Sequence, residues 1–168
     1  MSLVPDYYFE KFNDISAEFL CEIGVRAVLL DVDNTLEPYE NAKPGEHVIS
    51  WLLSLKESGI LAAIVSNNHS DRIDLFNEDI MLPAISDAGK PFAKNLKLML
   101  GKLGVAPDEA AFIGDQIFTD VWAARNAGMR AILVPPINDK RDLFTKFKRL
   151  LEKPIMKAYY KKNSKESK

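Results

Sequence analysis

The sequence predicts a single α/β domain built on a doubly wound parallel sheet of about five strands. Short apolar segments alternate along the chain with amphipathic ones, as parallel strands alternate with crossover helices. Apolar residues make up 47% of the 168 residues and charged residues 27%, a balance typical of globular proteins. Polar residues suited to chemistry follow several apolar segments, at the edge where parallel sheets bind ligands.

The helices are predicted from apolar periodicity and from their end signals. Ser16 is expected to cap the first helix, which Gly24 ends. Pro91 is expected in the first turn of one helix, and Pro154 is expected to end the last. The predicted helices span residues 16–23, 44–58, 70–77, 91–103, 119–127 and 139–152.

The strands are predicted where short apolar runs lie between these helices, at residues 25–31, 60–66, 83–86, 110–113 and 130–134. The first strand is expected at the centre of the sheet, because the densest polar cluster follows it. Residues 1–154 are predicted to form the domain, and residues 155–168 a basic tail.

Two acids one residue apart, Asp31 and Asp33, follow the first strand. Burying two carboxylates at a strand end is costly unless a cation or a reaction needs them. Asp31 is suited to attack phosphorus, and Asp33 to act as general acid for the leaving group and as base for water. The alternative is structural: a turn or helix cap at Asp33-Asn34, with Asp31 at a solvated strand end.

The next two strands also end in residues that suit a phosphate group. Ser66 can donate its hydroxyl to a phosphate oxygen, helped by the following backbone amides from Asn67 onward. Lys90 precedes a helix and follows Gly89, which permits close approach. Taken singly, these segments also fit a turn with a helix cap and an ordinary surface lysine.

The strand at 110–113 leads into Gly114-Asp115, and Asp120 follows five residues later. Asp115 is suited to bind Mg²⁺, and Asp120 to hold a water of the metal's outer shell or Lys90. Asp120 fits equally well as a first-turn acid favoured by the helix dipole.

In this order, the segments resemble the motifs of the haloacid dehalogenase (HAD) superfamily of phosphohydrolases over residues 25–134. The resemblance implies a Rossmann-like sheet, an Mg²⁺ cofactor and a phosphatase. Asn34-Thr35-Leu36 and the run from Gly114 to Asp120 resemble more narrowly the YqeG-type branch of subfamily IIIA, which is related to mitochondrial phosphatidylglycerophosphate phosphatases.

The resemblance also implies residue roles. Asp31 would be the nucleophile and Asp33 the acid/base, while Ser66, Asn67 and Lys90 would hold the phosphoryl group. The metal ligands would be Asp31, the Asp33 backbone carbonyl and Asp115, with Thr35 and Asp120 behind them. Many members carry two adjacent acids in the fourth motif, whereas this chain separates Asp115 from Asp120.

The segments between the motifs leave no room for a cap domain, so the site is expected to be open. An open site suits a large or surface-bound phosphate ester, and phosphatidylglycerophosphate is the substrate that the resemblance suggests. The alternative is a non-catalytic protein that uses the acidic pocket to hold a metal or a partner. A receiver-type signalling domain also uses acids and a lysine, but gives no reason for Asp33 as proton donor.

Charge is distributed unevenly along the chain. Residues 140–168 hold eleven Lys/Arg against three Asp/Glu, a balance of +8, whereas residues 1–139 have a balance of −10. The basic tail either contacts an anionic membrane or is a solvated terminal helix. Nucleic acid is not expected as a partner. With one cysteine and no long apolar run, the sequence predicts a cytoplasmic protein, which would be peripheral to the inner membrane face if the tail contacts lipid.

Overall fold

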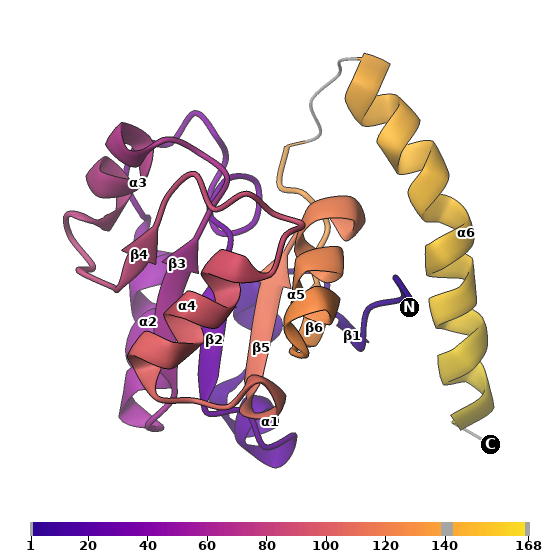
Figure 1. The fold of residues 1–168 in the computed structure, drawn as a ribbon, viewed down its shortest axis with the longest axis horizontal. Helices are drawn as coiled ribbons and strands as arrows, with labels where there is room; N and C mark the ends of the chain where they lie inside the picture. The colour runs from indigo at the N-terminus through magenta and orange to yellow at the C-terminus, as the bar shows by residue number, and fades with distance from the viewer. Residues whose placement is uncertain (1, 139–142, 167–168) are drawn as a thin grey trace.

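The structure is a computed structural model that describes residues 2–138 and 143–166, and it is built on a parallel sheet (Figure 1). The spatial order of the strands is β1-β6-β5-β2-β3-β4, which places β2 at the centre, as predicted. The strands are β1 Tyr7–Tyr8, β2 Ala27–Leu30, β3 Leu61–Val65, β4 Ala84–Ile85, β5 Ala110–Gly114 and β6 Arg130–Leu133.

The sheet has six strands, and its edge strand β1 was not among the five predicted. The extra strand, β1, contains only Tyr7 and Tyr8, which pair with Ile132 and Leu133 of β6. A strand of two residues is too short to show the alternation of apolar and polar residues that identifies longer strands.

Helices cover both faces of the sheet, as in a doubly wound fold (Figure 1). One face packs against the 3₁₀ turn η1 Phe12–Asp14 and the helices α1 Ala17–Glu22, α2 Glu46–Glu57 and α3 Ser70–Asn77. The other packs against α4 Lys94–Leu103 and α5 Trp122–Ala127, and the π-helical turn η3 Ile117–Val121 leads directly into α5. The 3₁₀ turn η2 Pro107–Glu109 lies between α4 and β5.

The central strand β2 is buried on both sides. Val28 and Leu30 belong to the apolar cluster under α1 and α2, whereas Ala27 and Leu29 belong to the cluster under α4 and α5. Successive side chains of a strand point to opposite faces, so burial on both faces requires an unbroken apolar run. This requirement explains why the apolar segment predicted the strand.

Two of the helix starts that differ from the prediction lie near the predicted site. The helix expected at 91–103 begins at Lys94, because Phe92 N donates to Gly89 O and closes a turn before it. The helix expected at 119–127 begins earlier, as the π-helical turn η3, and continues into α5. Both differences lie next to predicted site residues, Lys90 and Asp120.

The last helix, α6 Leu143–Glu166, contains Pro154 in its interior, so the prediction that Pro154 ends it was wrong. Its predicted start at Asp139 lies outside the described residues. An interior proline costs a helix about 3 kcal/mol. Packing offsets this cost, because one face of α6 is turned toward the body and carries the buried or half-buried residues Glu152, Ile155, Met156 and Tyr159.

Hydrogen bonds between described residues fasten α6 to the body. Tyr8 N donates to Tyr159 Oη over 3.0 Å, and Ile117 N donates to Glu152 Oε1 over 3.3 Å. The helix therefore contacts both the edge strand β1 and the turn that follows β5. The predicted boundary between residues 154 and 155 falls inside α6. Among the described helices, none combines the length and the apolar character that crossing a membrane requires.

Candidate active site

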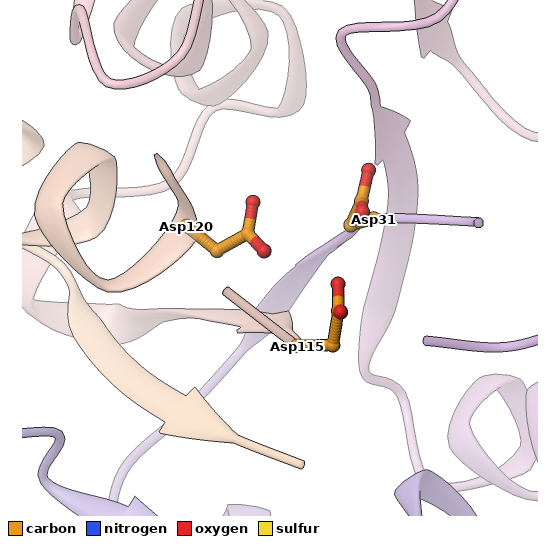
Figure 2. Close-up of side chains that lie close together, drawn as sticks. All are labelled: Asp31, Asp115 and Asp120. Carbon is orange, nitrogen blue, oxygen red and sulfur yellow. The ribbon is translucent and has the colours of Figure 1, made fainter. Parts of the chain in front are cut away.

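Three carboxylates from separate segments meet at the carboxyl edge of the sheet. Asp31 follows β2, Asp115 follows β5, and Asp120 lies in η3, and their side chains face a common space (Figure 2). All three are buried, and each offers an oxygen atom within 4.8 Å of the oxygens of the others. The meeting of adjacent parallel strand ends, which the sequence predicted, accounts for this convergence.

The backbone around Asp31 is fixed by the sheet and by a tight turn. Asp31 N donates to Ile113 O over 3.0 Å, which extends the ladder between β2 and β5. Asn34 then adopts φ 63°, a left-handed conformation that asparagine tolerates better than most residues. The turn brings Thr35 Oγ1 to 3.4 Å from Asp115 Oδ1, where Thr35 was expected to support the metal site.

Lys90 links two of the three carboxylates. Its Nζ lies 2.8 Å from Asp31 Oδ1 and 2.8 Å from Asp120 Oδ1, and over the ring of Phe112. Burial alone would lower the pKa of Lys90, but the carboxylates of Asp120 and Asp31 outweigh burial and raise this pKa above its ordinary value. Lys90 is therefore a charged group inside the site, not a surface lysine.

Asp120 is a member of this cluster and not only a first-turn acid. Burial, assisted by the nearby charge of Asp31, raises the pKa of Asp120, while Lys90 acts in the opposite direction. The other oxygen, Oδ2, accepts a hydrogen bond from Gln116 N over 3.0 Å. A Cβ atom on Gly114 would lie 2.5 Å from Asp120 Cγ, so only glycine lets this side chain approach.

The donor set of the cluster fits a divalent cation. Three carboxylates and one ammonium group leave a charge of −2 when all are ionised, and burial makes that excess costly. Oxygen atoms of carboxylates are the ligands that Mg²⁺ prefers in proteins. The side chain of Asp33 is not part of this cluster.

The carboxyl group of Asp33 is held by two residues that sequence reasoning missed. Asn68 Nδ2 donates to Asp33 Oδ2 over 2.8 Å, and Arg72 Nη2 lies 3.0 Å from Asp33 Oδ1. Asn68 follows the predicted Ser66 by two residues, and its N–H donates to Ser66 Oγ over 3.3 Å. Arg72 lies in the first turns of α3 and gives no local signal that distinguishes it from a surface residue.

Ser66 and Asn67 lie between these groups. Ser66 is buried, and its carbonyl accepts from Ala88 N over 2.9 Å, which ties the end of β3 to the segment before Lys90. The Asn67 side chain accepts from Lys90 N over 2.7 Å and donates to Lys90 O over 3.1 Å. The amide of Asn67 therefore positions Lys90, and its backbone N–H is the group left for the expected phosphate contact.

Comparison with known proteins agrees with the motif order. Residues 87–145 match the family model described as HAD-hydrolase-like. The chain is 33% identical over 159 residues to the probable phosphatase YqeG of Bacillus subtilis, covering 95% of this chain and 92% of that protein. It is 28% identical over 117 residues to the glyceraldehyde 3-phosphate phosphatase of Pyrococcus furiosus, covering 64% of this chain and 48% of that protein.

The fold is also similar to solved structures. The cobalt-bound deoxy-D-mannose-octulosonate 8-phosphate phosphatase of Haemophilus influenzae superposes with a TM-score of 0.54 at 15% identity, over 81% of this chain and 90% of that one. An uncharacterised protein from Listeria monocytogenes gives a TM-score of 0.55 at 16% identity, over 70% and 85%. With the near full-length similarity to YqeG, these findings show that the chain belongs to the HAD superfamily of hydrolases and is a phosphatase of that family.

Proposed function

We propose that the chain hydrolyses phosphomonoesters with Mg²⁺ as cofactor and that Asp31 carries the phosphoryl group as an aspartyl phosphate. The proposal rests above all on the placement of Asp31. Its Oδ1 lies 2.8 Å from Lys90 Nζ, within a group of three buried carboxylates at the ligand-binding edge of the sheet. A carboxylate placed beside a fixed cation is suited to attack phosphorus.

In the first step, a carboxylate oxygen of Asp31 bonds to phosphorus while the ester P–O bond breaks. The Lys90 ammonium stands beside Asp31 and offsets the negative charge of the phosphoryl oxygens. Ser66 Oγ accepts from Asn68 N, so its own O–H is still available to donate to a phosphoryl oxygen. The backbone N–H of Asn67 completes the proposed phosphate contacts.

Asp33 is the proposed proton carrier. It gives a proton to the leaving oxygen in the first step, and it takes one from the water that attacks the aspartyl phosphate in the second. Its carboxyl group lies two residues beyond Asp31 and outside the acidic cluster, where Asn68 and Arg72 hold it. This separation leaves Asp31 to react with phosphorus and Asp33 to transfer protons.

Asp31, Asp115 and the backbone carbonyl of Asp33 would hold the Mg²⁺, with Thr35 and Asp120 behind them. When bound, the ion offsets the charge of the carboxylates and of the phosphoryl oxygens. Burial, with the nearby charge of Asp31, raises the pKa of the neighbouring Asp120, and this direction supports a cation that offsets the negative charge of the site.

The reaction can be tested with an aryl phosphate in the presence of Mg²⁺. Asp31→Asn should abolish turnover and prevent labelling of the protein by a radioactive phosphate ester, while the circular dichroism spectrum stays that of the folded protein. Near wild-type turnover by a folded Asp31→Asn protein would refute the assignment of Asp31 as the nucleophile. Binding of Mg²⁺ by a wild-type protein without turnover of any phosphate ester would favour the alternative of a non-catalytic metal- or partner-binding protein.

We propose phosphatidylglycerophosphate as the substrate, on the strength of the motif resemblance and the short segments between the motifs. Only α2 and β3 follow the Asp33 turn before Ser66, and only α3 and β4 precede Lys90. These segments belong to the sheet and its covering layer and add no further domain over the site, which supports access by a head group that projects from a surface. Hydrolysis of this lipid in mixed vesicles, compared with small soluble phosphate esters, tests the assignment.

The outer face of α6 supports a contact with anionic lipid at the inner face of the membrane. Leu150, Leu151 and Tyr160 are exposed there, among the exposed lysines Lys153, Lys157, Lys161 and Lys162. Basic residues near an anionic leaflet contribute about 1 kcal/mol each. Tyr159 is buried against β1, so it is not part of this face.

Charge reversal tests the contact better than truncation, because truncation would also remove the bond from Tyr8 to Tyr159. Replacement of Lys153, Lys157 and Lys161 by glutamate should weaken sedimentation with anionic vesicles at low salt. The same replacement at the exposed lysines of α4, Lys94, Lys97 and Lys102, provides a control of equal charge. Equal loss in both variants would argue for a general charge effect, and no binding by the wild type would remove the proposal.

A further inference from the structure

Arg72 connects Asp33 to the loop that contains Asn41 and Ala42, which precede Arg72 by 31 and 30 residues in the sequence. Its Nη2 lies 3.0 Å from Asp33 Oδ1 and also donates to Asn41 O over 2.7 Å. Its Nη1 donates to Ala42 O over 2.9 Å. One guanidinium group therefore contacts the turn after β2 and the loop before α2 at the same time.

The ion pair between Arg72 and Asp33 is largely shielded from water, whereas the bonds to Asn41 O and Ala42 O lie at the surface. The side chains of Arg72 and Asp33 are 14% and 15% exposed, and the guanidinium group also lies over the ring of Phe76. Partial burial strengthens an ion pair relative to one on the surface. The planar guanidinium group can bind three acceptors in fixed directions, which the ammonium group of lysine cannot reproduce.

The loop that accepts from Arg72 is itself anchored. Glu37 is buried, and its Oε1 accepts from Gly45 N over 2.8 Å while its Oε2 accepts from Asn41 Nδ2 over 2.7 Å. The carbonyl groups of Asn41 and Ala42 therefore stand on a loop tied at both ends. Arg72, bound to this loop, holds the Asp33 carboxyl group in place. The turn after Asp31 lacks the regular hydrogen-bond ladder of a strand, so the backbone alone fixes Asp33 less firmly.

Both oxygens of Asp33 are engaged from different elements. Asn68, at the end of β3, holds Oδ2, and Arg72, on α3, holds Oδ1. Contacts to both oxygens fix the plane of the carboxyl group as well as its position. A proton carrier needs such a fixed direction, because a displacement of about 1 Å can cost on the order of 100-fold in rate.

We propose that Arg72 is a positioning residue of the phosphatase reaction, which sets the direction of the Asp33 carboxyl group through the 41–42 loop. Arg72 acts through Asp33 and touches no reacting atom in this assignment. The proposal rests on the proposed function, in which Asp33 transfers the proton, and it adds a residue that the motifs do not contain.

Arg72→Gln should lower kcat on the order of 10- to 100-fold with little change in KM, since substrate contacts are left in place. Arg72→Lys, which keeps the charge for the ion pair with Asp33 but loses the two hydrogen bonds to Asn41 O and Ala42 O, should restore only part of the rate. Lys43→Gln is the matched control. Lys43 lies in the same loop and pairs with Glu78 and Asp79 after α3, without contact to Asp33, so its loss should leave kcat unchanged.

A double-mutant cycle separates positioning from a general structural role. In the Asp33→Asn background, Arg72→Gln should cause no further loss of kcat on an aryl phosphate, because the group that Arg72 positions is already inactive. Equal losses in the two backgrounds, or a wild-type rate in folded Arg72→Gln, would overturn the proposal. Absence of phosphatase activity in the wild type would instead refute the proposed function, so the two failures are distinguishable.

Discussion

Removal of the Lys90 charge is the perturbation whose effect the site geometry defines best. In Lys90→Met, a side chain of similar length and volume replaces the ammonium group, but both contacts of 2.8 Å to Asp31 and Asp120 are lost. Asp115 belongs to the same cluster. The variant therefore keeps three buried carboxylates together without their cation.

The expected loss follows from burial. Removing one partner of a buried ion pair typically costs about 3–5 kcal/mol, because the other charge is left without compensation. The Lys90 side chain is 2% exposed, so solvent screening gives little discount. Its pKa is raised above the unfolded value, by Asp120 and Asp31 against the effect of burial, so its contribution is fully present at neutral pH. That contribution is lost only as pH rises through the raised pKa.

Urea unfolding followed by circular dichroism, at pH 7 with chelator, should show a decrease of about 3–5 kcal/mol in the free energy of unfolding. Lys94→Met, at an exposed lysine four residues further along the chain, is the control and should change the free energy of unfolding by less than about 0.5 kcal/mol. A loss below about 1 kcal/mol in Lys90→Met would refute the reasoning that this lysine compensates the buried carboxylates.

Three further outcomes are expected. Asp115→Ala should raise the Mg²⁺ concentration that gives half-maximal activity by about tenfold or more. Full activity of the wild-type protein in excess chelator would contradict the metal assignment. Asp33→Asn should slow alkyl phosphates more than an activated aryl phosphate, whose leaving group needs little protonation; equal losses would argue against proton donation. Gly114→Ala should destabilise the protein by about 1–3 kcal/mol and lower activity, because its Cβ would lie 2.5 Å from Asp120 Cγ; thermal unfolding that matches wild type would show that Asp120 can move away.

The sequence predicted that the site residues converge, because this convergence depends only on the order of the strands and on where each strand ends. Asp31 and Asp115 each follow a strand whose apolar run is visible in the sequence, and adjacent parallel strands bring their ends together. Lys90 and Asp120 were also anticipated as partners, and the distance of 2.8 Å between them agrees with that expectation.

Features that depend on contacts between distant segments could not be predicted in this way. Arg72 takes its place only because the 41–42 loop folds over the start of α3. The room that Gly114 makes for Asp120 likewise depends on the turn that returns the chain from Asp115 to Asp120. Pro154 was expected to end a helix, because local propensity carries no information about the packing of α6 on the body.

The edge position of β1 affects the order in which parts of the fold can form during synthesis. The amino-terminal residues leave the ribosome first, yet Tyr7 and Tyr8 pair with β6, more than 120 residues later. Asp6 likewise accepts from Ala131 N and pairs with Arg125. At synthesis rates of about 5–20 residues per second, this segment waits roughly 6–24 s for its partners. The first strand in the sequence is thus among the last to be placed, after the sheet centre that holds Asp31 has its neighbours.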